Sequence, residues 1–187
     1  MPHSPSTVPT RDLPLAILLN GPSSAGKSTL VGALQNRFRT MFLGFGIDSI
    51  LYALPPADLA AMKAGRPINR EGYTYDLLVE AHHAAIRAVL ESGCRVIVDT
   101  ALLRPAHRIG FDTAVKGFDT FRIGVTCNPD ELDRRERERG DRPIGSGRRE
   151  AGIVHDEMLY DLVVDTTDTL VDVLLDQVLD ALHRWRP

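Results

Sequence analysis

The chain has 187 residues, of which 43% are hydrophobic and 25% are charged, and its formal net charge is -3. This balance is typical of one globular domain with a substantial core, and it excludes a broadly basic surface for nucleic acid or membranes. No apolar run in the sequence is long enough to cross a bilayer, so we expect a cytoplasmic protein. Residues 1–14 are polar and rich in proline, and we expect a flexible leader before a single domain over residues 15–187.

The first half of the domain begins with an apolar run at 15–20, which predicts a buried strand, and residues 27–38 follow with a helical pattern. A second short strand is expected at 41–45. Residues 50–65 have a mixed pattern that two adjacent prolines interrupt, and residues 73–91 have helical spacing. A third strand is expected at 94–98, and a helix at 105–115.

The second half continues this alternation with a strand at 120–127, a helix at 129–139, a loop rich in glycine and arginine at 139–149, a strand at 161–165 and a helix at 172–185. Cys94 and Cys127 fall in predicted buried strands, where we expect inert thiols. Five strands alternating with helices predict an α/β domain with a parallel sheet and helices on both faces. Ligands of such sheets lie beyond the carboxyl ends of the strands.

The most informative segment follows the first predicted strand, where GPSSAGKS matches the phosphate-loop pattern G-x-x-x-x-G-K-[ST] in full. Its glycines let backbone N–H groups turn inward around an anion, and the helix that follows adds its positive end. Lys27 is expected to reach the β- and γ-phosphates of ATP, and the Ser28 hydroxyl to ligate Mg²⁺. The residues expected to contact the nucleotide are Gly21, Pro22, Ser23, Ser24, Ala25, Gly26, Lys27, Ser28 and Thr29.

Two aspartates follow predicted strands, and each has a predicted role. Asp99 ends the third strand, where its carboxylate is expected to hold Mg²⁺ together with Ser28. Asp48 follows the second strand in the stretch FGIDS, and we expect it to face the phosphate loop and take the proton of an attacking hydroxyl. The alternative for both is an ordinary capping role. The segment at about 50–92 predicts the cover of a cavity for an amphipathic acceptor.

Arginines crowd the segment at about 135–150, which we expect to form a lid. Arg135 and Arg139 share a helix face because they are four residues apart. We expect these two and Arg142 to close over the γ-phosphate, spread its charge and exclude water. Arg134 and Arg137 fit an ordinary solvated helix, whose expected surface partners are Glu131, Glu136 and Glu138.

The stretches LNGPSSAGKS, FGIDS, RERERGDR and IVHDEMLYDLVVDTT, in this order, resemble the chloramphenicol phosphotransferase-like proteins, a family of small P-loop kinases. The resemblance implies a P-loop kinase fold with an Arg-rich lid and ATP-dependent phosphorylation of a hydroxyl on a small molecule. It places the family's proposed general base at Asp48 and its lid arginines at Arg135, Arg139 and Arg142.

Two further expectations come from this resemblance. By similarity to nucleotide kinases, Thr166 and Thr167 after the fifth predicted strand should border the adenine. The chain departs from the family pattern at Thr100, which follows Asp99 where a second acidic residue is expected.

The sequence therefore predicts an O-phosphotransferase that uses ATP and Mg²⁺ to phosphorylate a small-molecule hydroxyl, with an antibiotic such as chloramphenicol as the acceptor. Two alternatives remain open: a metabolic or sugar-nucleotide kinase, and an ATP-binding regulator without transfer activity. A nucleic-acid acceptor is disfavoured by the acidic balance of the chain.

Overall fold

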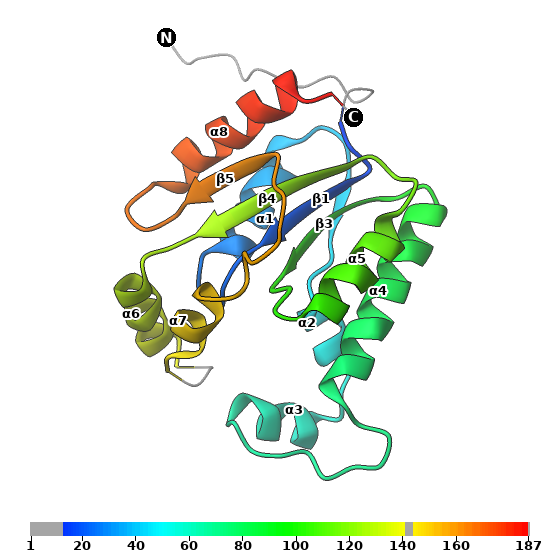
Figure 1. The fold of residues 1–187 in the computed structure, drawn as a ribbon, viewed down its shortest axis with the longest axis vertical. Coiled ribbons are helices and arrows are strands. Elements are labelled where there is room, and N and C mark those ends of the chain that lie inside the picture. The colour runs from blue at the N-terminus through cyan, green and yellow to red at the C-terminus, as the bar shows by residue number, and fades with distance from the viewer. Residues whose placement is uncertain (1–12, 141–143, 187) are drawn as a thin grey trace.

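One sheet of five parallel strands organises the domain, with the strand order β2-β3-β1-β4-β5. The computed structural model describes residues 13–140 and 144–186, so residues 1–12 of the predicted leader lie outside the described part. The parallel pairing confirms the predicted α/β fold class (Figure 1). The strands are β1 (Ala16–Asn20), β2 (Phe42–Gly44), β3 (Arg95–Thr100), β4 (Thr120–Thr126) and β5 (Leu162–Asp165).

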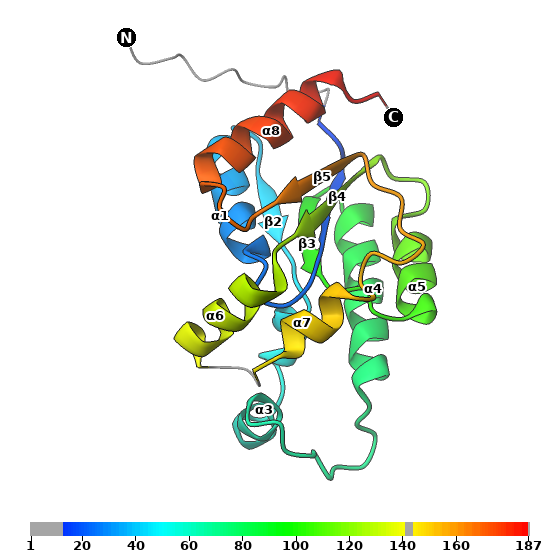
Figure 2. The same ribbon diagram turned by 60° about the vertical axis from the view of Figure 1, so that its left-hand side comes forward.

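Helices cover both faces of this sheet (Figure 2). On one face lie α1 (Lys27–Arg37) and α8 (Val171–Arg184), and on the other lie α4 (Tyr75–Glu91) and α5 (Pro105–Val115). The central strand β1 supplies both cores, because Ile17 and Leu19 face α1 and α8 whereas Ala16 and Leu18 face α4 and α5. Successive strand residues point to opposite faces, so a strand covered on both sides must be apolar throughout.

The remaining helices gather beyond the carboxyl ends of the strands: α2 (Asp48–Leu51), α3 (Pro56–Lys63), α6 (Pro129–Arg139) and α7 (Ser146–Ala151). The mixed segment at 50–65 thus contains two helices, and Pro56 occupies the first turn of α3, where a missing N–H is tolerated. Cys94 lies just before β3 and is half-buried, and Cys127 lies just after β4 and is buried, so the prediction that both lie inside buried strands is wrong. No helix in the described ranges is long and apolar enough to span a membrane.

The sequence-based expectation of a loop at 139–149 is wrong in part, because α7 begins at Ser146. Its start is fixed by Glu136 of α6, whose carboxylate accepts the backbone N–H of Gly145 at 2.6 Å and that of Gly147 at 2.7 Å. Glu136 is 1% exposed, so the expectation that it is a surface partner is also wrong. A carboxylate can be buried here because it satisfies two N–H groups at the open end of a helix.

Two buried histidines of α4, His82 and His83, differ in their hydrogen bonds. The His82 ring stacks on Phe45 with centroids 5.4 Å apart, and its Nε2 lies 3.0 Å from the Phe45 carbonyl oxygen. His83 packs against Gly110 of α5, and its buried Nε2 has no hydrogen-bond partner among the described residues. Burial, together with His82 and His107 nearby, lowers the pKa of His83 to about 4. His83 is therefore neutral in the folded protein at neutral pH.

Replacing Glu136 with alanine should loosen the contact between α6 and α7. Two backbone N–H groups would lose their partner, and we expect the free energy of unfolding to fall by about 2 kcal/mol in chemical denaturation. Hydrogen exchange at Gly145 and Gly147 should accelerate. The matched control is Glu138→Ala on the same helix, whose side chain is 61% exposed and should contribute less than about 0.5 kcal/mol. Equal effects of the two substitutions would contradict this role for Glu136.

The low pKa of His83 predicts how stability depends on pH. The unfolded chain binds a proton near the ordinary histidine pKa of 6.5, whereas the folded protein does so only near 4. This contribution to stability is therefore complete above pH 6.5 and is lost as the pH falls toward 4, by at most about 3 kcal/mol. Urea unfolding across this range should show the decline in the natural chain and a shallower one in His83→Leu. An unchanged slope would exclude His83 as the source.

Candidate active site

The loop between β1 and α1 encloses a space at the carboxyl end of the central strand. At Gly21 a Cβ would lie 2.3 Å from the carbonyl oxygen of Val125, and Gly26 enters α1 with a φ of 79°, so both positions require glycine. The Lys27 ammonium donates to the carbonyl oxygens of Gly21 at 2.8 Å and Pro22 at 2.7 Å. The loop is thus closed around its own lysine, which is the arrangement in which loop backbone N–H groups can face an anion.

Ser24 has two features that are typical of a ligand site. Its φ of 62° is a left-handed conformation that residues other than glycine rarely adopt. Its buried hydroxyl has no hydrogen-bond partner among the described residues. Backbone strain and an unpaired buried hydroxyl both occur preferentially where a ligand completes the site.

Asp99 joins the phosphate loop to the segment that carries Asp48. The Ser28 hydroxyl donates to Asp99 Oδ2 at 2.7 Å, so two oxygen ligands of the kind that Mg²⁺ prefers lie side by side. On the other side, a Cβ at Gly46 would lie 2.2 Å from Asp99 Oδ1, so only glycine permits this approach. The neighbouring Thr100 is buried, and its carbonyl oxygen accepts the N–H of Gly21 at 3.2 Å.

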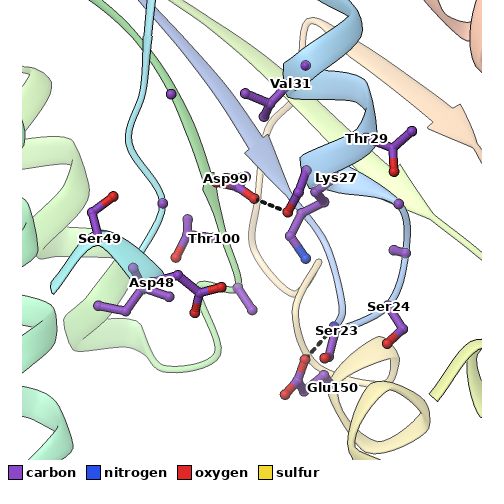
Figure 3. A pocket seen from close by; sticks show the side chains of 18 of the residues that line it. Ser23, Ser24, Lys27, Thr29, Val31, Asp48, Ser49, Asp99, Thr100 and Glu150 are labelled. Atoms are coloured by element: carbon purple, nitrogen blue, oxygen red, sulfur yellow. Dashed lines mark hydrogen bonds between the residues drawn. The ribbon is translucent and has the colours of Figure 1, made fainter. Parts of the chain in front are cut away.

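Asp48 is the first residue of α2 and faces the cavity beside Lys27 (Figure 3). Its loop is held from behind by Phe45, which bonds to Ile97 of β3 through its backbone N–H at 2.9 Å and stacks on His82. The stretch FGIDS therefore has distinct parts: Phe45 anchors the loop, Gly46 allows the approach to Asp99, and Asp48 presents its carboxylate.

The cavity in front of these groups has a volume of about 480 Å³. Residues 23–29 of the phosphate loop line one half of it. The other half, which we name the acceptor half, is lined by Ile47, Asp48, Ser49, Tyr52, Tyr75, Thr100, Ala101 and Leu103. The structure thus brings the predicted base and the predicted phosphate-binding residues to one continuous space.

A second cavity of about 480 Å³ adjoins the opposite side of the loop and does not include Asp48. Leu170, Val171 and Leu174 give it an apolar wall, and Thr166 lies at its edge. The Thr166 hydroxyl donates to the carbonyl oxygen of Ala25 at 2.9 Å, so the loop after β5 supports the phosphate loop directly. Thr167 has another contact, because its hydroxyl accepts the N–H of Asn128 at 2.8 Å.

Arg135 lines this second cavity, whereas we expected it over the γ-phosphate. Its guanidinium donates to the carbonyl oxygen of Thr166 at 2.6 Å and to Glu131 at 2.7 Å. Hydrogen bonds from Arg134 and Arg135 lower the pKa of Glu131 to about 2, so this carboxylate remains charged and fixes the arginine. Arg139 lines both cavities. Arg142 lies outside the described residues.

The stretch IVHDEMLYD forms an anchor behind the site. Asn20, at the end of β1, donates to the carbonyl oxygen of Val154 at 2.8 Å and to the Tyr160 hydroxyl at 2.7 Å. His155 Nδ1 lies 2.8 Å from the same hydroxyl, and burial raises the pKa of Tyr160. Burial, with a contribution from the nearby charge of Lys27, lowers the pKa of His155. This network ties the segment after α7 to the central strand.

Glu150 of α7 is a site residue that the sequence analysis missed. Its Oε2 accepts the backbone N–H of Ser23 at 2.6 Å, so a carboxylate touches the phosphate loop directly (Figure 3). The sequence around Glu150, with its arginines and small residues, is typical of a solvated helix. Only the packing of α7 against the loop brings Glu150 to the cavity.

Comparisons with known proteins show the family and the fold of this chain. The family model described as chloramphenicol phosphotransferase-like protein matches residues 15–183. Proteins from two strains of Mycobacterium tuberculosis, each named "Putative O-phosphotransferase", are 35% identical over 88% of this chain and 80% of their own length. A gluconokinase from Sinorhizobium meliloti shares the fold with a TM-score of 0.67, at 20% identity over 92% of this chain and 93% of its own. The APS kinase of Mycobacterium tuberculosis does so with a TM-score of 0.63, at 16% identity over 91% and 98%. The chain therefore belongs to the chloramphenicol phosphotransferase-like family and is a phosphotransferase with the P-loop kinase fold.

Proposed function

We propose that this protein transfers the γ-phosphate of ATP to a hydroxyl of a small, uncharged organic molecule. The observation that carries this proposal is the shared cavity, in which the Asp48 carboxylate faces the phosphate loop and Lys27. A protein that only binds ATP needs the loop but has no use for a carboxylate aimed at the terminal phosphate. Such a carboxylate is the group that an attacking alcohol requires.

The nucleotide would occupy both cavities. Its base would lie on the apolar wall beside Thr166 and Arg135, and its phosphates would lie in the loop of residues 21–28, where the Ser24 hydroxyl lacks a partner among the described residues. Arg135 would thus serve the nucleoside end, and Arg139, which lines both cavities, is the described arginine best placed to follow the phosphates.

Magnesium fits the residues present beside the loop. Ser28 and Asp99 supply two oxygen ligands, and the described ranges contain no group of three or more His, Cys, Asp or Glu that could hold an ion alone. The ion would thus depend on phosphate oxygens and water for its other ligands, which is the usual arrangement for Mg²⁺ with ATP. When bound, it supplies positive charge that offsets the charge developing on the transferred phosphoryl group.

The reaction then needs two actions from the chain. Asp48 accepts the proton of the acceptor hydroxyl as its oxygen bonds to the γ-phosphorus and the bond to the β-phosphate oxygen breaks. Lys27 leaves the loop carbonyl groups and stabilises the β- and γ-oxygens. The products are ADP and a phosphate ester.

The acceptor half of the cavity favours an uncharged acceptor. Its polar groups are hydroxyls and the Asp48 carboxylate, and its aromatic groups are Tyr52 and Tyr75. The basic residues among the described residues that line the cavity are Lys27 and Arg139, which the proposal assigns to the phosphates of ATP. An acceptor that carries a phosphate or carboxylate would need arginine or lysine partners and would be repelled by Asp48. This composition suits a hydroxylated antibiotic such as chloramphenicol better than a sugar nucleotide.

A panel of acceptors tests the proposal. We would incubate the protein with Mg·ATP and chloramphenicol, other hydroxylated antibiotics, neutral sugars or sugar nucleotides, and detect the phosphorylated product by mass. We expect product from an uncharged alcohol and none from Lys27→Ala, which loses the phosphate-binding ammonium. Tight ATP binding without product from any acceptor would support a regulator instead, and product from sugar nucleotides alone would overturn the proposed acceptor class.

Replacing Asp48 with asparagine should separate binding from transfer. The amide keeps the size of the side chain but cannot take a proton at neutral pH, so we expect ATP affinity to be nearly unchanged and turnover to fall by about 100-fold or more. Calorimetry gives the affinity, and product formation gives the rate. The control is Asp112→Asn, an exposed carboxylate on α5 that pairs with Arg122 outside both cavities. An unaffected rate in Asp48→Asn would remove Asp48 from the mechanism.

A further inference from the structure

A carboxylate of the protein itself occupies one anion-binding position of the phosphate loop. Glu150 Oε2 lies 2.6 Å from the backbone nitrogen of Ser23, the distance of a strong hydrogen bond to a charged acceptor. The backbone N–H groups of such a loop hold phosphate oxygens when a nucleotide binds. One N–H group cannot form a full hydrogen bond to both the carboxylate and a phosphate oxygen. Two anions placed side by side at one N–H group also repel each other.

The position of Glu150 indicates which phosphate it opposes. Glu150 and Ser23 line the first cavity with Asp48, and neither lines the second cavity with Thr166 and its apolar wall. The carboxylate therefore lies at the end of the loop that faces the acceptor. In the proposed function, that end belongs to the terminal phosphate of ATP, and ADP has no phosphate there.

The helix that carries Glu150 has a fixed position. At Gly147 a Cβ would lie 2.6 Å from the carbonyl oxygen of Ser23, so the backbone of α7 packs directly on the loop. The Glu136 carboxylate of α6 holds the same glycine, because it accepts the backbone N–H of Gly147 at 2.7 Å. The carboxylate is therefore held against Ser23 by the fold of α6 and α7.

We propose that Glu150 is an internal competitor of the γ-phosphate: it occupies the Ser23 N–H in the nucleotide-free protein, and ATP but not ADP must displace it. This proposal rests on the proposed function. Its consequence is a site in which the terminal phosphate binds against a competing charge, and in which the carboxylate can return to Ser23 once the phosphate has been transferred. The displacement of Glu150 by the phosphate also links nucleotide binding to α7. Through Glu136 it is linked to α6, which carries Arg135 and Arg139.

Nucleotide affinity in Glu150 variants tests this proposal. Glu150→Gln removes the charge and keeps the size of the side chain, and Glu150→Ala removes both the charge and the contact. Calorimetry with Mg·ATP and Mg·ADP should show ATP binding tighter by about tenfold in both variants, while ADP changes by less than about threefold. The matched control is Glu157→Gln, in the segment after α7, whose 81% exposed side chain pairs with Arg108 outside the cavities. It should leave both affinities unchanged.

Three results would overturn the proposal. Unchanged or weaker ATP binding in Glu150→Gln would mean that the carboxylate does not oppose the phosphate. Equal tightening of ATP and ADP would mean that it acts on the whole nucleotide rather than on the terminal phosphate. If the unsubstituted protein binds neither nucleotide, the proposed function fails as well, and this outcome differs from a protein that binds ATP but ignores Glu150.

A measurement without nucleotide gives a second test. If Glu150 occupies the Ser23 N–H, hydrogen exchange at the Ser23 amide should be faster in Glu150→Ala than in the unsubstituted chain, while β1 remains protected as a check that the fold is intact. Equal exchange at Ser23 in a folded variant would also overturn the proposal.

Discussion

The contact between Asp99 and its two neighbours is the constraint on which the site depends. Ser28 of the phosphate loop bonds to one carboxylate oxygen, and the backbone at Gly46 lies against the other with no room for a side chain. The two segments come from strands that flank β3, so the sheet alone brings them near each other. The carboxylate fixes the remaining distance, and Asp48 thereby shares a cavity with Lys27.

Charge inside α6 and α7 has structural uses that a surface helix would not require. Glu136 is buried and holds the start of α7, Glu131 fixes Arg135 beside the loop after β5, and Glu150 bonds to the phosphate loop. Each carboxylate accepts hydrogen bonds from backbone N–H groups or a guanidinium, and these bonds offset its loss of hydration. The region that we expected to be a simple lid is therefore also part of the frame that shapes the nucleotide site.

The patterns that gave correct predictions are local ones. Unbroken apolar runs predict strands covered on both faces, and the strand–loop–helix order around Lys27 predicts the phosphate loop, because the neighbouring residues alone satisfy these requirements. The missed features depend on distant partners. Nothing in the sequence around Glu136 or Glu150 distinguishes them from Glu138, which is exposed, until α6, α7 and the loop pack together.

The sequence by itself determined the strand and helix order, the position of the phosphate-loop pattern between a strand and a helix, and the identity of the residues at the ends of the strands. Each of these follows from periodicity or from a short motif whose chemistry is local. Only the tertiary structure decided which of those residues share a cavity, that Arg135 lies beside Thr166, and that Glu150 contacts Ser23. These relations join residues more than thirty positions apart, and packing, not local sequence, sets such distances.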